Sequence, residues 1–481
     1  MSRLRPRVAW FSPLAPDPSG ISAYSELLLP LLAEAWDLTL FVDGYAPTDP
    51  FAATLPFVDC GAQDPLPLLP SFDAVVYQMG NSGSHAYIYD TLMAWPGLVV
   101  MHELSIHHFV AGRTAAAGRI DLYLREVRAQ LGDAAAEEAR RAFYDSIDGP
   151  WETRPIEFPM NRRVLDQATG VLCHSRFVRD AIERVHPKLA VVRADHPAWP
   201  HDRTTERRGE EAGDAPLRLV AAGNLTANKS IEEIIVACGL LAQDHDLELR
   251  LVGNLEIDAD LEVLCEVTGC ADRVEALGRV SDETLMRELE EADLVFCMRS
   301  PTLGETSGIV LRTCSVGTPV VVSDVGWFRE IPDEVAIKIP APLASAEDLA
   351  RQLSPFLNDT ADLAARGDAA LAWAEAATPE KTARAYLAWI EEAGRFPHVM
   401  TGRAFGLAAE IARELDMEFP AEEALARAEL FRQLLREAPA ARPDWLYPPE
   451  HLAPVARAPS RAPSPEADRP GPTEPSGDRE R

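Results

Sequence analysis

The feature that most constrains the fold is an alternation of short apolar runs with segments of helical spacing, which occurs twice along the chain. Several of these runs are continuously apolar, as expected for strands that are buried on both faces of a parallel sheet. Two successive β-α alternations predict an α/β protein with two doubly wound, Rossmann-like domains and a cleft between them.

Each series consists of six predicted strands with helical segments between them. The strands of the first series are Arg7–Phe11, Leu38–Val42, Ala74–Tyr77, Leu98–Met101, Gly170–Cys173 and Ala190–Arg193, and its helices include Ser22–Ala35 and Ser175–Arg184. The strands of the second series are Leu217–Ala222, Leu247–Val252, Val274–Leu277, Leu294–Cys297, Pro319–Ser323 and Ala336–Ile339, and its helices include Ile231–Leu241, Asp282–Glu291 and Val310–Val316.

Breaks in the alternation predict the domain boundaries. The first domain spans residues 1–200, and an Ala-, Arg- and Glu-rich stretch at about 109–165 is predicted to be a helical insertion in it. Residues 201–215 are charged and lack bulky apolar side chains, which is typical of a linker. The second domain spans residues 216–395.

Two further segments are expected after the second domain. Residues 396–440 are predicted to form a helical extension. Residues 441–481 are Pro-rich and have few bulky apolar side chains, so they cannot form a core and are predicted to be a disordered tail.

The charge of the chain excludes some classes of partner. The 481 residues include 46 Lys and Arg against 76 Asp and Glu, a formal net charge of −30. Such a chain is not expected to bind nucleic acid or to adhere strongly to an anionic membrane, although a peripheral membrane contact stays open. The seven cysteines are scattered without a CxxC pair, and we find neither a secretory signal nor a membrane-spanning run, so a reduced, cytoplasmic protein is expected.

The first loop that could bind a ligand is PLAPDPSGIS, residues 13–22, between the first strand and its helix. Gly20 in this turn would let backbone N–H groups approach a phosphate at the start of the helix. The alternative is a plain surface loop that ends in a Ser cap. The loop contains no GxGxxG, so a nicotinamide fingerprint is absent.

The second loop is GNLTANKS, residues 223–230, after the first strand of the second domain. It places Lys229 at the start of the next helix, beside the carboxyl end of the sheet, where an ammonium can neutralise a diphosphate leaving group. The alternative is an ordinary turn with a surface lysine.

The third loop, RSPTLGETSGIVL at residues 299–311, carries the strongest signal. Glu305 lies among small residues, where few core contacts are expected, and is suited to accept hydrogen bonds from sugar hydroxyls. The N–H groups of Ser307, Gly308 and Ile309 at the following helix start can bind an anion. The alternative is helix capping by Thr306 or Ser307, with Glu305 favoured by the helix dipole.

The two motifs GNLTANK and GETSGIVL…GTPVVVSD together resemble the retaining GT-B glycosyltransferases of family-4 type, also called glycosyltransferase group 1. The resemblance implies that Lys229 binds the donor diphosphate and that Glu305 contacts the donor sugar. The family's arginine position holds Asn224 here. The family's second glutamate, which contacts the ribose, corresponds to Arg312 or Thr313, depending on the direction of counting.

The resemblance also implies two further contacts. Backbone groups at Val280, in Gly-Arg-Val after a strand, would receive the nucleotide base, and His102 would face the donor sugar. His102, His107 and His108 invite a metal interpretation, but the fifth position of an HExxH motif is Ile106, so that motif fails. No metal is expected, since no carboxylate pair such as DxD lies plausibly at a strand end to hold one. No cofactor is expected either, because the nucleoside-diphosphate sugar is a co-substrate.

The function that this resemblance implies is transfer of a sugar, with retention, from a nucleoside-diphosphate sugar to an acceptor hydroxyl. The catalytic candidates are His102 and Glu305, and the donor-binding candidates are Gly20, Asn224, Lys229, Val280, Ser307, Gly308, Ile309 and Arg312. Alternatives are a sugar-nucleotide epimerase, a phosphorylase, or a non-catalytic nucleotide-sugar-binding protein. The acceptor (a glycan, lipid or small molecule) and the oligomeric state stay open.

Overall fold

The computed structural model describes residues 5–145, 147–201, 215–257 and 259–395. Most of the predicted linker, the expected helical extension over 396–440 and the expected tail over 441–481 lie outside the described residues.

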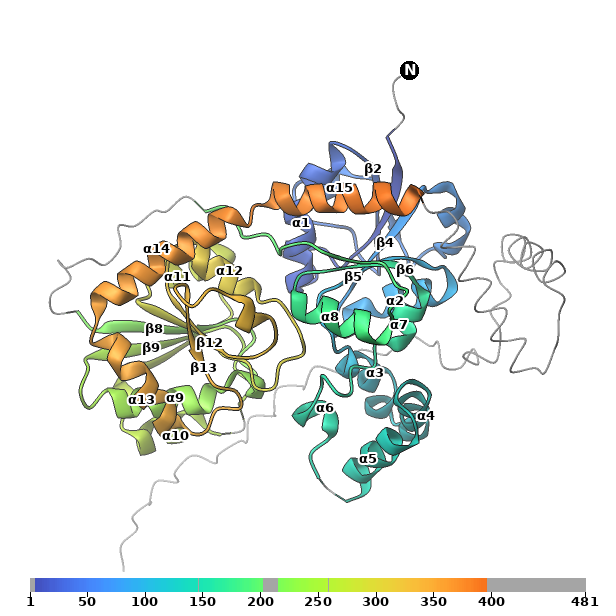
Figure 1. The fold of residues 1–481 in the computed structure, drawn as a ribbon. Helices are drawn as coiled ribbons and strands as arrows, with labels where there is room; N and C mark the ends of the chain where they lie inside the picture. The colour runs from blue at the N-terminus through green and yellow to red at the C-terminus, as the bar shows by residue number, and fades with distance from the viewer. Residues whose placement is uncertain (1–4, 146, 202–214, 258, 396–481) are drawn as a thin grey trace, which may run out of the picture. The chain divides into compact units, whose positions relative to one another are not determined.

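The first half of the chain, residues 5–201, forms a sheet of seven parallel strands in the order β3-β2-β1-β4-β5-β6-β7 (Figure 1). The strands are β1 Arg7–Phe11, β2 Asp37–Val42, β3 Phe57–Asp59, β4 Ala74–Met79, β5 Gly97–Met101, β6 Ala168–Cys173 and β7 Val191–Arg193. Alternate residues of a strand face opposite sides. Accordingly Ala9 and Phe11 belong to one buried cluster, and Val8 and Trp10 belong to another.

Helices cover this sheet and build the insertion. The helices that accompany the strands are α1 Gly20–Ala33, α2 Ala86–Ala94, α7 Arg162–Gln167 and α8 Arg176–Val185. The stretch predicted to be a helical insertion contains α3 His107–Arg113, a 3-10 turn at Ala115–Ala117, α4 Ile120–Leu131, α5 Asp133–Tyr144 and α6 Pro150–Thr153. Ser175, which follows β6, caps α8 by accepting the N–H of Val178.

The second half, residues 215–376, forms a sheet of six parallel strands in the order β10-β9-β8-β11-β12-β13. Its strands are β8 Leu217–Ala222, β9 Leu247–Val252, β10 Val274–Gly278, β11 Leu294–Cys297, β12 Val320–Ser323 and β13 Ala336–Ile339. Its helices are α9 Ile231–Leu241, α10 Leu261–Thr268, α11 Asp282–Glu290, α12 Gly308–Ser315, α13 Ala346–Leu357 and α14 Thr360–Ala376. The prediction of two doubly wound α/β domains is thus confirmed.

The strand order positions the site. Strand β8 has its sequence neighbour β9 on one side and β11 on the other. Strands β8 to β10 are therefore added toward one edge of the sheet, and strands β11 to β13 toward the other edge. Ligands of doubly wound sheets bind where loops diverge at such a switch point. The loops that leave this point are the two predicted motifs, residues 223–230 after β8 and residues 298–307 after β11.

The last described helix, α15 Pro379–Arg395, follows the second half in sequence but packs against α1 of the first half (Figure 1). Tyr386 and Trp389 lie in the same buried cluster as Trp10 and Tyr24. The hydroxyls of Tyr24 and Tyr386 are 2.9 Å apart. The predicted boundary at residue 395 therefore assigns to the second domain a helix whose core contacts belong to the first.

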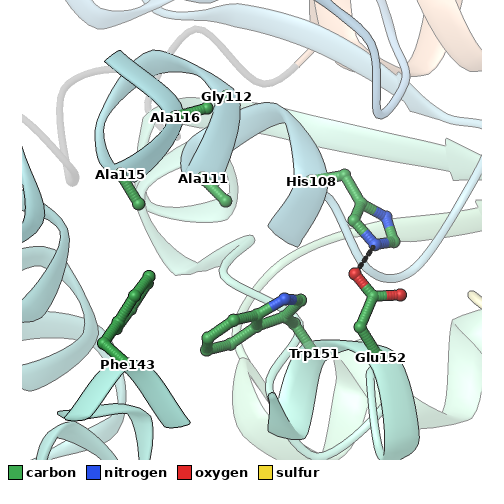
Figure 2. Close-up of a pocket in the computed structure, with 8 residues that line it drawn as sticks. All are labelled: His108, Ala111, Gly112, Ala115, Ala116, Phe143, Trp151 and Glu152. Carbon is green, nitrogen blue, oxygen red and sulfur yellow. Dashed lines mark hydrogen bonds and ion pairs between the residues drawn. The ribbon is translucent and has the colours of Figure 1, made fainter. Parts of the chain in front are cut away.

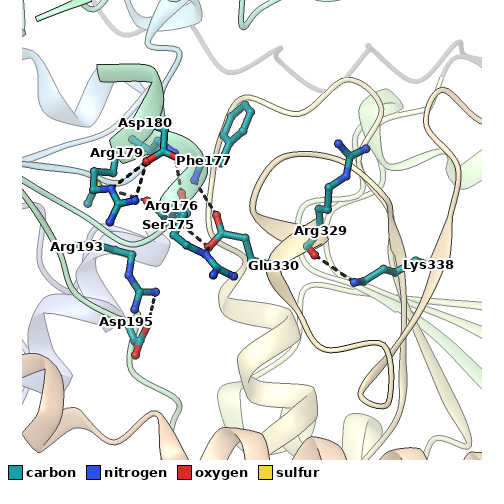
Figure 3. Close-up of polar contacts among 12 residues, drawn as sticks. Ser175, Arg176, Phe177, Arg179, Asp180, Arg193, Asp195, Arg329, Glu330 and Lys338 are labelled. Atoms are coloured by element: carbon teal, nitrogen blue, oxygen red, sulfur yellow. Dashed lines mark hydrogen bonds and ion pairs between the residues drawn. The ribbon is translucent and has the colours of Figure 1, made fainter. Parts of the chain in front are cut away.

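Polar contacts join the two halves at the start of α8 (Figure 3). The carboxylate of Glu330 accepts the backbone N–H groups of Arg176 and Phe177 at 3.0 and 2.7 Å. An anion at a helix N-terminus satisfies free N–H groups and is favoured by the helix dipole. None of the helices in the described ranges is long and apolar enough to cross a lipid bilayer.

Candidate functional site

The loop after β8 is held close to the loop after β9. Gly253 has a φ of +133°, and a Cβ there would lie 1.9 Å from the carbonyl oxygen of Gly223. Close backbone approach of this kind admits only glycine. The approach fixes the start of the GNLTANKS loop, which then turns through Ala227–Lys229 and returns Lys229 toward the end of β8.

Lys229 is a buried cation. Its side chain is 8% exposed, and Nζ donates to the carbonyl oxygen of Ala222 at 3.3 Å. Among the described residues, no carboxylate lies within ion-pair distance of this ammonium. Burial, followed by the nearby charge of Arg299, lowers the pKa of Lys229 from 10.5 to about 7. Burial of an unpaired cation is costly, which is why the pKa is lowered, and binding of an anion at Lys229 stays a prediction.

Helix α12 begins beside this lysine. A Cβ on Gly223 would lie 3.1 Å from Nζ of Lys229 and 3.3 Å from the side chain of Ile309. Ser307 caps the helix by accepting the N–H of Val310 at 3.4 Å. In the described part of the chain, the N–H groups of Gly308 and Ile309 have no hydrogen-bond partner. Gly223 thus lies against both Lys229 and Ile309, so the structure brings Lys229 to the start of α12, where Ser307 and Gly308 also lie. Binding of one anion by these four residues stays a prediction.

Glu305 has more contacts than its loop of small residues predicts. Its Oε1 pairs with Nε of Arg299 at 2.7 Å. Its Oε2 accepts the hydroxyl of Thr302 at 2.9 Å and the N–H of Leu303 at 2.7 Å. A carboxylate has about four acceptor sites, so these three bonds leave about one for a sugar hydroxyl. The role of Glu305 as a sugar contact stays a prediction.

Glu103 is a site residue that the sequence did not reveal. Its Oε1 accepts the backbone N–H of Asn81 at 3.2 Å. The two residues after it, Leu104 and Ser105, both donate backbone N–H groups to the carbonyl oxygen of Leu303, at 3.0 and 2.9 Å. Burial, followed by the nearby charge of Glu305, raises the pKa of Glu103 from 4.5 to about 7. Two carboxylates from distant segments thus meet beside Arg299, a proximity that no local motif signals.

His102 follows β5 and lies in a buried cluster of rings, 9% exposed. Its Nε2 is 2.7 Å from Oε1 of Gln78, and the amide nitrogen of Gln78 donates to the hydroxyl of Tyr386 at 3.3 Å. This orientation of the amide makes Nε2 of His102 the protonated nitrogen and leaves a lone pair on Nδ1. Burial, together with the neighbouring His174, holds the pKa of His102 well below its usual value. His102 is therefore a neutral hydrogen-bond acceptor.

The other two histidines of this segment lie in the helical insertion. Both ring nitrogens of His107 are engaged at 2.6 Å, one by the carbonyl oxygen of Phe158 and one by the hydroxyl of Tyr123. His108 is bonded to Asn81 and Glu152. The described residues include no group of three or more His, Cys, Asp or Glu placed to hold a metal ion, and the absence of a metal from the reaction stays a prediction.

The remaining predicted residues make other contacts or are exposed. Arg312 pairs with Asp282 at 3.1 Å, and its guanidinium lies 4.4 Å from the ring of Trp199. Val280 follows β10 two residues before Asp282, so Arg312 is linked to the loop of Val280. Gly20 at the start of α1 and Asn224 after β8 are exposed and take no part in these contacts.

Comparison with known proteins supplies an independent finding. Residues 202–373 match the profile of the family described as glycosyl transferases group 1. An uncharacterized glycosyltransferase of Methanocaldococcus jannaschii is 36% identical over 135 residues, which is 28% of this chain and 34% of that protein. The alpha-D-kanosaminyltransferase of Streptomyces kanamyceticus is 27% identical over 223 residues, 43% of this chain and 56% of that protein. The chain therefore spans between a third and little more than half of these relatives.

Solved structures resemble the chain over a longer range. The sucrose-phosphate synthase of Thermosynechococcus elongatus aligns with a TM-score of 0.56 at 17% identity, covering 81% of this chain and 99% of that one. HepE of Anabaena, determined in complex with UDP, aligns with a TM-score of 0.54 at 15% identity, covering 81% of this chain and 100% of that one. At these identities the likeness establishes the fold.

Proposed function

We propose that this protein transfers a sugar from a nucleoside-diphosphate sugar to an acceptor hydroxyl. The match of residues 202–373 to the profile described as glycosyl transferases group 1 supports the proposal. The observation that carries the proposal is the buried ammonium of Lys229, which lies beside the start of α12 without a carboxylate partner among the described residues. A diphosphate would supply the missing negative charge.

The chemistry of such a transfer matches what these residues offer. The bond between the anomeric carbon and the diphosphate oxygen breaks with oxocarbenium character, and its electron pair leaves with the diphosphate. Lys229 and the N–H groups of Gly308 and Ile309 would stabilise this charge, which is the type of catalysis that preorganised donors provide. The neutral His102 and the remaining acceptor site of Glu305 would orient the sugar hydroxyls.

We further propose that the configuration of the anomeric carbon is retained and that no metal ion takes part. Both proposals come from the resemblance of the two loop motifs to the retaining enzymes. The donor is a nucleoside-diphosphate sugar, and UDP is the first nucleotide to test because HepE, which shares the fold, is known in complex with UDP.

The experiment is a measurement of nucleoside diphosphate release from UDP-, GDP- and ADP-sugars, with and without a panel of hydroxyl acceptors. The wild-type protein should release a diphosphate from one of these donors, and Lys229→Ala should reduce the release strongly. Lys188→Ala, which removes an exposed lysine of the first half, is the matched control and should be unaffected. Equal release by all three proteins would remove Lys229 from the reaction.

One observation favours a second function, binding of a nucleotide sugar without transfer. Glu305 is largely engaged by Arg299, Thr302 and Leu303, and an arginine or a threonine occupies the position of the family's second acid. Tight binding of a donor without release of diphosphate, for every donor and acceptor tested, would support this second function.

A further inference from the structure

The helical insertion contains a pocket of about 410 Å³, within the usual size range of small-ligand sites. In Figure 2, small residues of α3 and of the following 3-10 turn, including Ala111 and Ala116, lie on one side. The rings of Phe143 and Trp151 lie opposite, and the pair His108–Glu152 closes one end. The lining is therefore apolar except at that end.

Packing behind the aromatic wall holds it in place. The Trp151 ring lies 5.3 Å from the ring of Phe143 and 5.5 Å from the rings of Tyr123 and His107. His107 is fixed by hydrogen bonds on both nitrogens, so its ring orientation is set. The aromatic wall of the pocket is thus supported from behind by packed rings.

The polar end of the pocket is connected to Glu103. Asn81 accepts the N–H of Phe109 at 2.8 Å through Oδ1, so its amide nitrogen is the atom that faces Nδ1 of His108, at 3.2 Å. Nε2 of a neutral His108 then donates to Glu152 at 3.2 Å. The backbone N–H of Asn81 donates to Glu103 at 3.2 Å. Asn81 therefore connects His108, at the end of the pocket, to the carboxylate of Glu103. All of these groups belong to the first half.

We propose that this pocket is the acceptor subsite and that the acceptor is a hydroxyl compound with an apolar group the size of one or two rings. The proposal rests on the proposed function, because an acceptor needs a sugar transfer at the adjoining site. A ring buried between the alanines and the two aromatic side chains loses contact with water, which is favourable. A purely polar sugar would leave its hydroxyls unpaired on these walls.

In this scheme the apolar group occupies the pocket and the reacting hydroxyl extends past His108 and Asn81 to Glu103. The acceptor oxygen then forms a bond to the anomeric carbon on the face from which the diphosphate leaves, so that the configuration is retained, while the bond from that carbon to the diphosphate oxygen breaks. The electron pair of the broken bond leaves with the diphosphate, and the hydroxyl proton passes to the carboxylate of Glu103. Glu103 is a catalytic residue in this scheme, and His108 and Asn81 are positioning residues.

The test uses 2-naphthyl β-D-glucopyranoside as the probe and methyl β-D-glucopyranoside as its polar counterpart, with the full chain. Ala116→Phe fills the pocket from an exposed position, and Ala117→Phe, on the neighbouring exposed residue outside the lining, is the matched control. Calorimetry without any donor should show binding of the naphthyl compound to the wild type and to Ala117→Phe, and at least tenfold weaker binding to Ala116→Phe. The methyl compound should not bind measurably.

A second readout tests the acceptor role. The naphthyl compound should accelerate diphosphate release from the donor in the wild type and in Ala117→Phe but not in Ala116→Phe, and Ala117→Phe should match the wild type without acceptor. If Ala116→Phe does not fold, Phe143→Ala removes one wall and should weaken binding at least fivefold.

Three outcomes overturn the proposal. Equal naphthyl affinity in wild type, Ala116→Phe and Ala117→Phe, or tighter binding of the methyl compound, shows that the pocket is not the site. If Ala116→Phe blocks binding of the naphthyl compound but that compound does not accelerate diphosphate release in the wild type, the pocket is not an acceptor subsite. Failure of the proposed function is a separate result, recognised by donor binding or release that Lys229→Ala leaves unchanged.

Discussion

The side chains of Arg299 and Glu305 form a buried ion pair, with Nε and Oε1 2.7 Å apart and with 12% and 14% of the side chains exposed. The charges of both residues also act on the pKa values of Lys229 and Glu103. The ion pair joins two residues of the loop between β11 and α12.

We predict that Glu305→Gln destabilises the protein by about 2–4 kcal/mol, because removal of one partner leaves a buried guanidinium uncompensated. Arg299→Met should cost a similar amount, and the double variant should cost less than the sum of the two. Urea unfolding of the wild type, the two single variants and the double variant measures the coupling free energy between Arg299 and Glu305. Asp333→Asn, which breaks the exposed pair with Lys338, should cost less than about 1 kcal/mol. Strict additivity of the two buried substitutions contradicts the coupling.

Glu103 predicts a pH dependence of stability. Its pKa is raised from 4.5 to about 7 in the folded protein, so the folded state binds its proton more tightly than the unfolded state. This stabilising contribution is fully present below pH 4.5 and is lost as the pH rises through 7. Glu103→Gln removes the titrating group, and its stability relative to the wild type should therefore increase by roughly 2 kcal/mol between pH 5 and pH 8.

Unfolding by urea at four pH values between 5 and 8 measures this difference. Glu34→Gln, at an exposed position after α1, is the control and should run parallel to the wild type. A Glu103→Gln curve that also runs parallel would mean that this carboxyl titrates normally.

The neutral state of His102 leads to a separate prediction about transfer. His102→Ala should leave nucleotide affinity within about twofold, because the nucleotide contacts are proposed in the second half, and should reduce transfer by a factor of about ten or more, a common effect of losing an orienting contact. Gln78→Met should have a smaller effect in the same direction, since it frees the imidazole to change tautomer. Calorimetry and initial rates separate the two effects. Parallel losses of affinity and rate in His102→Ala place His102 at the nucleotide instead.

Much of the fold follows from local patterns. Strands such as Arg7–Phe11 and Leu217–Ala222 have the predicted bounds, because an apolar run buried on both faces is a strong local signal. The three-residue edge strand Phe57–Asp59 was not predicted, since it is short and only partly buried. The packing of α15 on the first half depends on contacts between residues more than 300 positions apart, such as Tyr24 and Tyr386, which periodicity does not reveal.

In the candidate site, too, some features follow from local sequence patterns and others depend on contacts between distant segments. The positions of Lys229 and Gly308 follow from a strand-loop-helix pattern whose geometry is local. The engagement of Glu305 by Arg299 and the approach of Glu103 to it depend on how loops from two sheets meet. A sequence motif identifies the residues of each loop but does not predict which residues of the two loops contact each other.

The central claim is that Lys229 binds the diphosphate, and proton uptake on binding tests it most directly. At pH 8 a lysine with a pKa of about 7 is mostly neutral, and a bound diphosphate raises that pKa, so the lysine takes up a proton. Calorimetric titration of UDP, GDP and ADP at pH 8, in two buffers of different ionisation enthalpy, measures the uptake. For the nucleotide that binds, we predict uptake approaching one proton in the wild type and none in Lys229→Arg. We also predict a loss of roughly 1–3 kcal/mol of binding free energy in Lys229→Ala and no change in Lys188→Ala. Binding with equal enthalpy in both buffers and undiminished affinity in Lys229→Ala would contradict the claim.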